Sequence, residues 1–252
     1  MNTTPTPRHW TKTADRPLRS AGTSLGIWLF AHFVGVPVPW RAVRQTDAVA
    51  LLAFEHERLR ALAAAGERVP PVLVFDGHSL VTGDIGTTLD HWLHATPEAE
   101  RLPLMSAAAA DLAAFHARGQ WHGGAQTRNI TWDGQHFARL DFEERLQPGL
   151  PLATVQVYDV LQLVLSQARY LQPLGPDAVR AVLRAYADAA HAAAAAPAKA
   201  PPPDLHGFIV HLLPRLKWVS RLAAWSSRLD GSRELMRLRT VLDGMAAFAG
   251  GA

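Results

Sequence analysis

One stretch of the chain, WHGGAQTRNITWDGQHFARLDFEE at residues 121–144, constrains the fold more than any other. It contains His122, then Asn129 seven residues later, and then Asp141 after a short apolar run. The Asp-Gly pair at 133–134 is a turn signal between two apolar runs, which predicts a β-hairpin. A hairpin would fold Asn129 and Asp141 towards each other. Such a pair of side-chain oxygens is typical of a Mg²⁺ site.

Composition describes an ordinary globular protein that is large enough for one domain or two small lobes. The chain has 252 residues, of which 48% are apolar and 19% charged. It has no cysteine, which excludes a disulfide scaffold and favours a reducing cytoplasm. A metal would therefore need histidine or oxygen ligands, which favours hard ions such as Mg²⁺.

Periodicity and turn signals predict an α+β chain. Its N-terminal part combines a helix with strands, and the remainder is mostly helical with one hairpin. The predicted strands are a short one at 9–14 and two within 72–86 that turn at Asp76-Gly77. The predicted helices lie within 47–71, directly after Gly86, and at about 103–118, 155–171, 176–196, 205–228 and 230–248.

The apolar segment at 25–40 is interrupted by a histidine, a glycine and two prolines. It is shorter than the ~20 apolar residues that a spanning helix needs, so we expect that it does not cross a membrane. It forms either a buried helix, which is the preferred interpretation, or a helix lying at an interface. Arginines flank it, and the region 205–239 is also basic, which suits phosphates, an anionic membrane or a solvated helix face.

The segment AFHARGQWHGGAQTRNITW…ARLDFEE resembles the catalytic segment of the protein-kinase-like superfamily. It is most similar to small bacterial members related to the lipopolysaccharide-core (Kdo/heptose) kinases and the aminoglycoside phosphotransferases, which carry HGDxxxxN followed by IDFE or IDFD. The likeness covers most of the chain and is strongest over 112–144. It implies a two-lobed kinase-like fold: a reduced N-lobe at 1–86 with an apolar helical insertion at about 20–46, and a mostly helical C-lobe at 87–252.

The resemblance also implies a cofactor set of ATP and Mg²⁺ and a role for each matching residue. Asn129 and Asp141 would hold the metal, and His122 would support the loop from inside. Asp159 would hydrogen-bond the backbone of that loop. Glu143 stands where related proteins have the glycine of Asp-Phe-Gly.

The nucleotide-binding residues that the resemblance implies lie in the N-terminal part. Glu55, with Glu57 as the alternative, would pair with the lysine that binds the phosphates. Backbone groups from about Thr82 to Asp84 would meet the adenine. The chain has no lysine between residues 20 and 54, so Lys12 is the candidate, and the eleven residues before it are too few for the usual two strands and glycine-rich lid.

The catalytic base departs from the family pattern. The aspartate of HGD aligns with Gly124, and the following lysine position with Gln126. Glycine cannot accept a proton, and loss of a base costs about 10²–10⁴ in rate. Gln126 could orient an acceptor, and Glu143 or Glu144 could replace the base.

Three functions follow from these residues. The first is an ATP- and Mg²⁺-dependent phosphotransferase that acts on a hydroxyl of a sugar, a lipid-linked glycan or a protein. The second is a pseudokinase, which binds a nucleotide or serves as a scaffold without phosphoryl transfer. A peripheral membrane adaptor using 25–40 and 205–239 is compatible with either. The expected location is the cytoplasm or the inner face of the membrane, the acceptor is unknown, and no specific nucleic-acid partner is expected.

Overall fold

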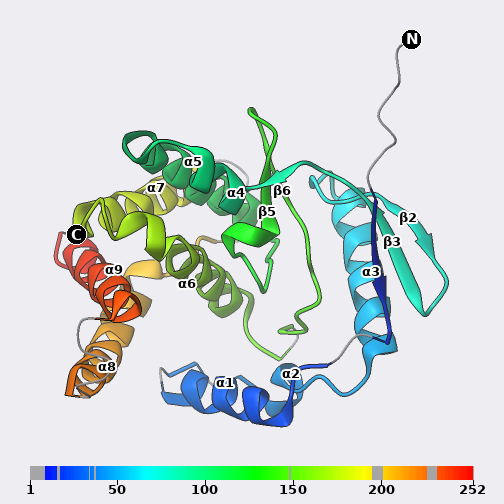
Figure 1. Ribbon diagram of the computed structural model, residues 1–252, viewed down its shortest axis with the longest axis horizontal. Coiled ribbons are helices and arrows are strands. Elements are labelled where there is room, and N and C mark those ends of the chain that lie inside the picture. The colour runs from blue at the N-terminus through cyan, green and yellow to red at the C-terminus, as the bar shows by residue number, and fades with distance from the viewer. Residues whose placement is uncertain are drawn as a thin grey trace.

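The fold is a mixed α+β arrangement of helices and two small antiparallel sheets (Figure 1). The structure is a computed structural model that describes residues 9–15, 18–33, 35–36, 38–147, 149–194, 201–225 and 232–251. None of the helices in these ranges combines the length and the apolar character needed to cross a bilayer.

The first sheet contains β1 (His9–Thr13), β2 (Val72–Phe75) and β3 (Ser79–Gly83) in the order β1-β3-β2. The predicted turn between β2 and β3 is confirmed. Asp76 Oδ1 accepts hydrogen bonds from the backbone N–H groups of His78 and Ser79, and Gly77 has a φ of 89°. Helix α3 (Ala48–Ala64) contacts β2 and β3 and buries Leu52 and Leu59.

Between β1 and α3 lie helix α1 (Ala21–Phe33) and the single turn α2 (Trp40–Val43). The preferred interpretation of this segment as a buried helix is wrong. Only a narrow face of α1, with Ser24 and Ala31, is buried, whereas Leu25 and Leu29 are 47% and 54% exposed. High hydropathy alone does not bury a helix, because burial also requires other elements that cover each of its faces. Helix α1 packs mainly along one face.

The second sheet contains β4 (Thr87–Thr88), β5 (Ile130–Trp132) and β6 (Phe137–Arg139) in that order. The predicted hairpin is β5–β6. Its turn is closed by Asp133 Oδ1, which accepts the N–H groups of Gln135 and His136. Helix α4 (Leu89–Ala95) begins at the Thr88 cap, and the short 3₁₀ turn η1 (Thr127–Asn129) leads into β5.

The rest of the chain is helical. It consists of α5 (Glu98–Ala117), α6 (Leu152–Leu171), α7 (Pro176–Ala194), α8 (Leu205–Trp225) and α9 (Arg233–Ala249). The prediction that the helix before the catalytic-type loop begins at 103 is wrong, because α5 begins at Glu98 and includes Pro103. Glu98 and Glu100 lie in its first turn, where the helix dipole favours carboxylates.

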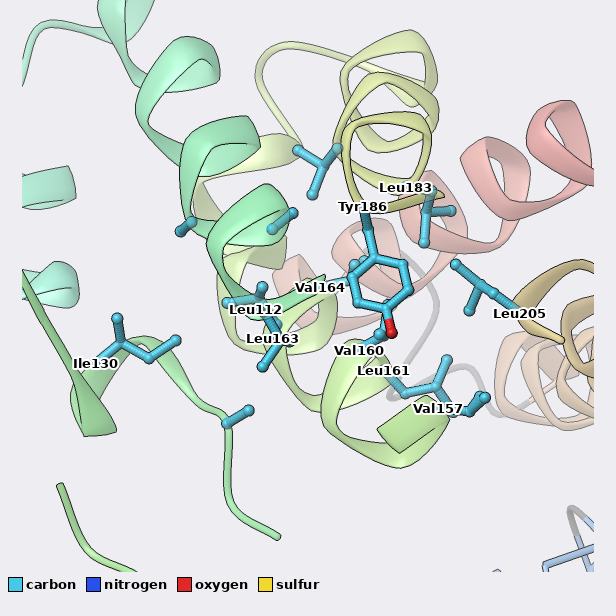
Figure 2. Packing of buried hydrophobic residues seen from close by; sticks show 14 of the residues in the cluster. Leu112, Ile130, Val157, Val160, Leu161, Leu163, Val164, Leu183, Tyr186 and Leu205 are labelled. Atoms are coloured by element: carbon cyan, nitrogen blue, oxygen red, sulfur yellow. The ribbon is translucent and has the colours of Figure 1, made fainter. Parts of the chain in front are cut away.

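The main core lies where α5, α6 and α7 meet. Figure 2 shows Tyr186 of α7 among side chains that include Leu112 of α5 and Val160 of α6. Tyr186 and Leu112 are 1% and 0% exposed. Burial of one such side chain stabilises the folded state by about 1.5–3 kcal/mol. This core supports α5 and α6, which bracket the loop at 118–129.

Candidate functional site

The ammonium group of Lys12 joins three elements that are far apart in the sequence. Lys12 lies on β1, and its Nζ is 2.7 Å and 2.8 Å from the two carboxylate oxygens of Glu55 on α3. It is also 2.5 Å from Asp141 Oδ1 and 3.8 Å from Glu143 Oε2, in the segment after β6. The structure therefore brings the candidate lysine, the candidate helix glutamate and the candidate metal-binding aspartate together.

The choice between Glu55 and Glu57 is settled by the faces of α3. Glu55 is 2% exposed and shares the buried face of the helix with Leu52 and Leu59. Glu57 is two positions along and is exposed, because residues two apart point to different sides of a helix. Glu55 is the residue that meets Lys12.

The carboxylates outnumber the ammonium group in this cluster. Glu55, Asp141 and Glu143 each place an oxygen within 4.8 Å of the others. Burial alone would lower the pKa of Lys12, but the charges of Glu55 and Asp141 outweigh burial and raise it. Burial raises the pKa of Glu55 despite the pull of Lys12, and Asp141 and Glu143 add to the rise. The oxygens of these three carboxylates lie close enough together to share one cation.

Asp141 adopts an unusual backbone conformation. Its φ of 69° is the one positive value at a non-glycine residue in the described part of the chain. Aspartate tolerates this left-handed region better than most residues, and such outliers concentrate at functional sites. The conformation follows directly after β6, and its side chain reaches Lys12.

Asn129 lies opposite the residue before Asp141. The backbone N–H of Leu140 donates to the carbonyl of Asn129 at 3.0 Å, which continues the pairing of the hairpin. The amide Nδ2 of Asn129 donates to the Gly124 carbonyl at 2.9 Å and fixes the side chain against the loop. The hairpin therefore places Asn129 beside the Asp141 segment, as its spacing predicts.

The carboxylate of Asp159 holds the loop from beneath. Asp159 is fully buried on α6, and it accepts the backbone N–H groups of His122 at 2.6 Å and Gly123 at 2.7 Å. It also accepts from His116 Nε2 at 3.3 Å, while Tyr186 donates its hydroxyl proton to His116 Nδ1 at 2.7 Å. Three donors satisfy a buried charge that would otherwise be costly.

His122 lies inside the loop. It is 1% exposed, its ring stacks on Phe142 at 4.5 Å between centroids, and its Nδ1 accepts the Gly124 N–H at 3.1 Å. Burial lowers the pKa of His122 to about 4, so the imidazole is neutral at physiological pH. A neutral, enclosed ring supports the loop and is not placed to transfer protons with solvent.

Gly124 and Gln126 occupy the positions where the family pattern has an aspartate and a lysine. A Cβ atom added at Gly124 would lie 3.4 Å from Asn129 Nδ2 and 3.7 Å from His122 Nδ1, which are ordinary contacts. A Cβ atom therefore fits at this position without a close contact. Gln126 is partly buried and donates from Nε2 to Gln162 Oε1 at 3.4 Å, so it contacts α6.

The residues predicted to meet an adenine lie at and after the end of β3. Thr82 is paired in the sheet register with Trp10 of β1 and Val72 of β2. Asp84 is exposed, and its Oδ1 accepts the N–H of Gly86 at 3.0 Å. Their contact with a nucleotide stays a prediction.

Two arginines at the site could not be found by sequence reasoning. Arg19, directly before α1, binds Glu144 Oε1 at 2.6 Å. Arg58 of α3 donates to the Trp121 carbonyl at 2.9 Å and lies 4.5 Å from the centre of that ring. The partners of Arg19 and Arg58 are separated by 125 and 63 positions, and no motif marks either pair.

A small hollow of about 80 Å³ opens beside Glu143 and Glu144. Its other lining residues come from α2, from the start of α3 and from Arg145. Burial raises the pKa of Glu144, and the charge of Arg19 opposes the rise. The hollow is smaller than the roughly 300–1,000 Å³ of a typical ligand pocket, so it suits a small group and not a whole nucleotide.

Comparisons with known proteins give no activity. No family model matches the chain. The chain is 33% identical over 97 residues to a Haemophilus influenzae protein described as uncharacterized. The match covers 37% of this chain and 40% of that protein, so the chain spans less than half of the relative's length.

Replacement of Lys12 should destabilise the protein, because Glu55 and Asp141 lose the ammonium group that they contact. We expect Lys12→Met to lower the free energy of unfolding by about 1–3 kcal/mol, because the buried Glu55 is left beside Asp141 and Glu143. The double variant Lys12→Met/Glu55→Gln should recover most of this loss, since the buried charge is also removed. Urea unfolding of the two single variants and the double variant measures the coupling, and additive effects would contradict it.

The buried histidines should make stability depend on pH. Burial depresses the folded-state pKa of His122 to about 4 and lowers that of His116, so the unfolded chain binds more protons below its own histidine pKa. The contribution of the histidines to stability is complete above about pH 6.5 and is lost as the pH falls below it, and for His122 the loss is about 2 kcal/mol at about pH 5. Urea unfolding at about pH 7.5 and about pH 5 should show a smaller loss of stability for His122→Asn than for the wild type. An equal loss in wild type and variant would contradict the assignment.

Proposed function

We propose that this chain is an ATP- and Mg²⁺-dependent phosphotransferase that acts on a hydroxyl group. The observation that carries the proposal is the Lys12 cluster, in which one lysine contacts a buried helix glutamate and the aspartate that follows the hairpin. Phosphoryl transfer needs a cation for the inner phosphates and oxygen ligands for Mg²⁺. The cluster offers both within a few ångströms.

Each residue of the cluster has a role in this proposal. Lys12 would neutralise the inner phosphates, and Glu55 would hold the lysine in place. Asp141 and Asn129 would ligate Mg²⁺, which prefers oxygen ligands and keeps several waters. The close approach of the Glu55, Asp141 and Glu143 carboxylates supports the binding of a divalent cation, because the ion would offset their mutual repulsion.

The acceptor hydroxyl needs a base other than residue 124. Glu143 and Glu144 line the hollow beside the cluster, and burial raises the pKa of Glu144 towards the range of a general base. In the proposal, the end of the acceptor that carries the hydroxyl enters this hollow. Because the transition state of phosphoryl transfer is loose, positioning and charge supply most of the catalysis, and a base adds less.

A pseudokinase is the second candidate, and the glycine at position 124 favours it. In this alternative the chain binds a nucleotide through the same cluster but transfers no phosphoryl group. Both candidate functions include nucleotide binding, and only the first includes transfer of a phosphoryl group. They therefore need one binding experiment and one kinetic experiment.

Mg²⁺-ATP should stabilise the folded protein. At a ligand concentration of about 100 times Kd the gain is about 2.7 kcal/mol, so the Tm should rise by roughly 5–10 °C. Asp141→Asn should remove the dependence of this rise on Mg²⁺, whereas Asp188→Asn, at an exposed position on α7, should not. No rise in wild type at millimolar ATP would exclude nucleotide binding, and a rise unchanged in Asp141→Asn would exclude Asp141 as a ligand.

Gly124→Asp should restore a base at a position where the structure leaves room for a Cβ atom. We expect the rate of ADP release from Mg²⁺-ATP to rise by about 10²-fold or more, with water as the acceptor. Gly124→Asn is the matched control, since it has nearly the same shape but accepts protons poorly. Equal rates in the two variants, both folded by circular dichroism, would contradict the view that residue 124 lacks the base.

A further inference from the structure

Two segments of the chain contain basic residues and no acidic ones. Residues 16–46 include Arg16, Arg19, Arg41 and Arg44, and residues 205–229 include Arg215, Lys217, Arg221 and Arg228, with no aspartate or glutamate in either segment. The rest of the chain mixes both signs of charge. Each segment also contains an apolar helix, α1 in the first and α8 in the second.

The two segments meet in the fold. The ring of Phe33 at the end of α1 lies 5.7 Å from the ring of Trp218 on α8. Arg215 of α8 also lies against Gly35, just after α1. In Figure 1 both helices lie along the lower edge of the molecule. The described parts of the two acid-free segments therefore meet where the end of α1 reaches α8.

This side exposes an apolar stripe on each helix. Leu25, Leu29 and Phe33 are spaced at i, i+4 and i+8 on α1, and all three are exposed. Val210, Pro214 and Trp218 repeat the spacing on α8, where Val210 is 48% and Trp218 54% exposed. We name these six residues the α1–α8 surface.

We propose that the α1–α8 surface docks on an anionic lipid bilayer. Exposed leucine and aromatic side chains would enter the boundary between headgroups and acyl chains, and the exposed Lys217, next to Trp218, would meet lipid phosphates. Tryptophan and lysine have apolar bodies with polar ends, which suits this boundary. Neither helix spans the bilayer, so the protein lies on the membrane.

Charge favours a bilayer over a second copy of the chain. Two copies that met through this surface would place basic segments of the same sign against each other, without acidic residues from either segment to neutralise them. An anionic bilayer supplies the missing negative charge. Apolar insertion and attraction to phosphates then act together.

The surface is connected to the candidate site. Arg19 directly precedes α1 and binds Glu144, which lines the hollow beside the Lys12 cluster. If the proposed function holds, docking presents that hollow to acceptors that are attached to lipids. Docking itself needs no nucleotide, so its test is independent of the proposed function.

Co-sedimentation of the full chain with vesicles tests the proposal without nucleotide. We expect binding to vesicles of phosphatidylcholine mixed with phosphatidylglycerol, and little binding to phosphatidylcholine alone. Binding should weaken as NaCl rises from about 0.1 M to about 1 M, because salt screens the attraction. Leu29→Ser/Trp218→Ser should weaken it at least ~10-fold, since two exposed apolar side chains no longer insert.

The matched control is Leu73→Ser/Leu165→Ser, which changes two exposed leucines on β2 and α6 and should bind as wild type does. Equal weakening by both double variants would overturn the proposal, as would equal binding to neutral and anionic vesicles. Sedimentation velocity without vesicles provides a further check. A dimer that Leu29→Ser/Trp218→Ser dissociates would assign the surface to a second copy and contradict membrane docking.

Discussion

The buried carboxylate of Asp159 is the interaction on which the geometry of the site depends. It binds the backbone of His122 and Gly123 and the ring of His116, and so ties the end of α5 and the loop to α6. Loss of this buried acceptor would leave each of its donors unsatisfied, at a cost of about 1–3 kcal/mol each, which favours the observed loop conformation. The fixed loop then sets the position of Asn129, through its bond to Gly124, and of Asp141 across the hairpin.

Lys12 connects this framework to the first sheet. Its ammonium group is the contact through which β1 and α3 meet the segment after β6, and three carboxylates lie close together there. Burial and the two neighbouring carboxylates raise the pKa of Glu55 in spite of the lysine. This repulsion between carboxylates is a physical reason to expect a further cation, and it underlies the proposed Mg²⁺-nucleotide site.

Local signals predicted the parts of the fold that local chemistry determines. The Asp-Gly pairs at 76–77 and 133–134 predicted both turns, which the structure contains. Contacts with no local signal were missed, such as Arg19 with Glu144, because they depend on how distant elements pack. The burial of α1 was predicted wrongly for the same reason: its apolar residues indicate a helix, but only the neighbours decide which faces are covered. The helix predicted to begin at about 103 begins at Glu98 in the structure, because α5 accommodates Pro103 after its first turn.

Hydrogen exchange with and without Mg²⁺-ATP tests the central claim most directly, because it locates a nucleotide on the chain. The account predicts slower exchange of backbone amides around Lys12 and in the segment that begins at Asp141, with little change in α7 and α9. It also predicts that this protection requires Mg²⁺ as well as ATP. Protection confined to the basic helix α8, or no change around Lys12 and Asp141 at saturating nucleotide, would contradict the account.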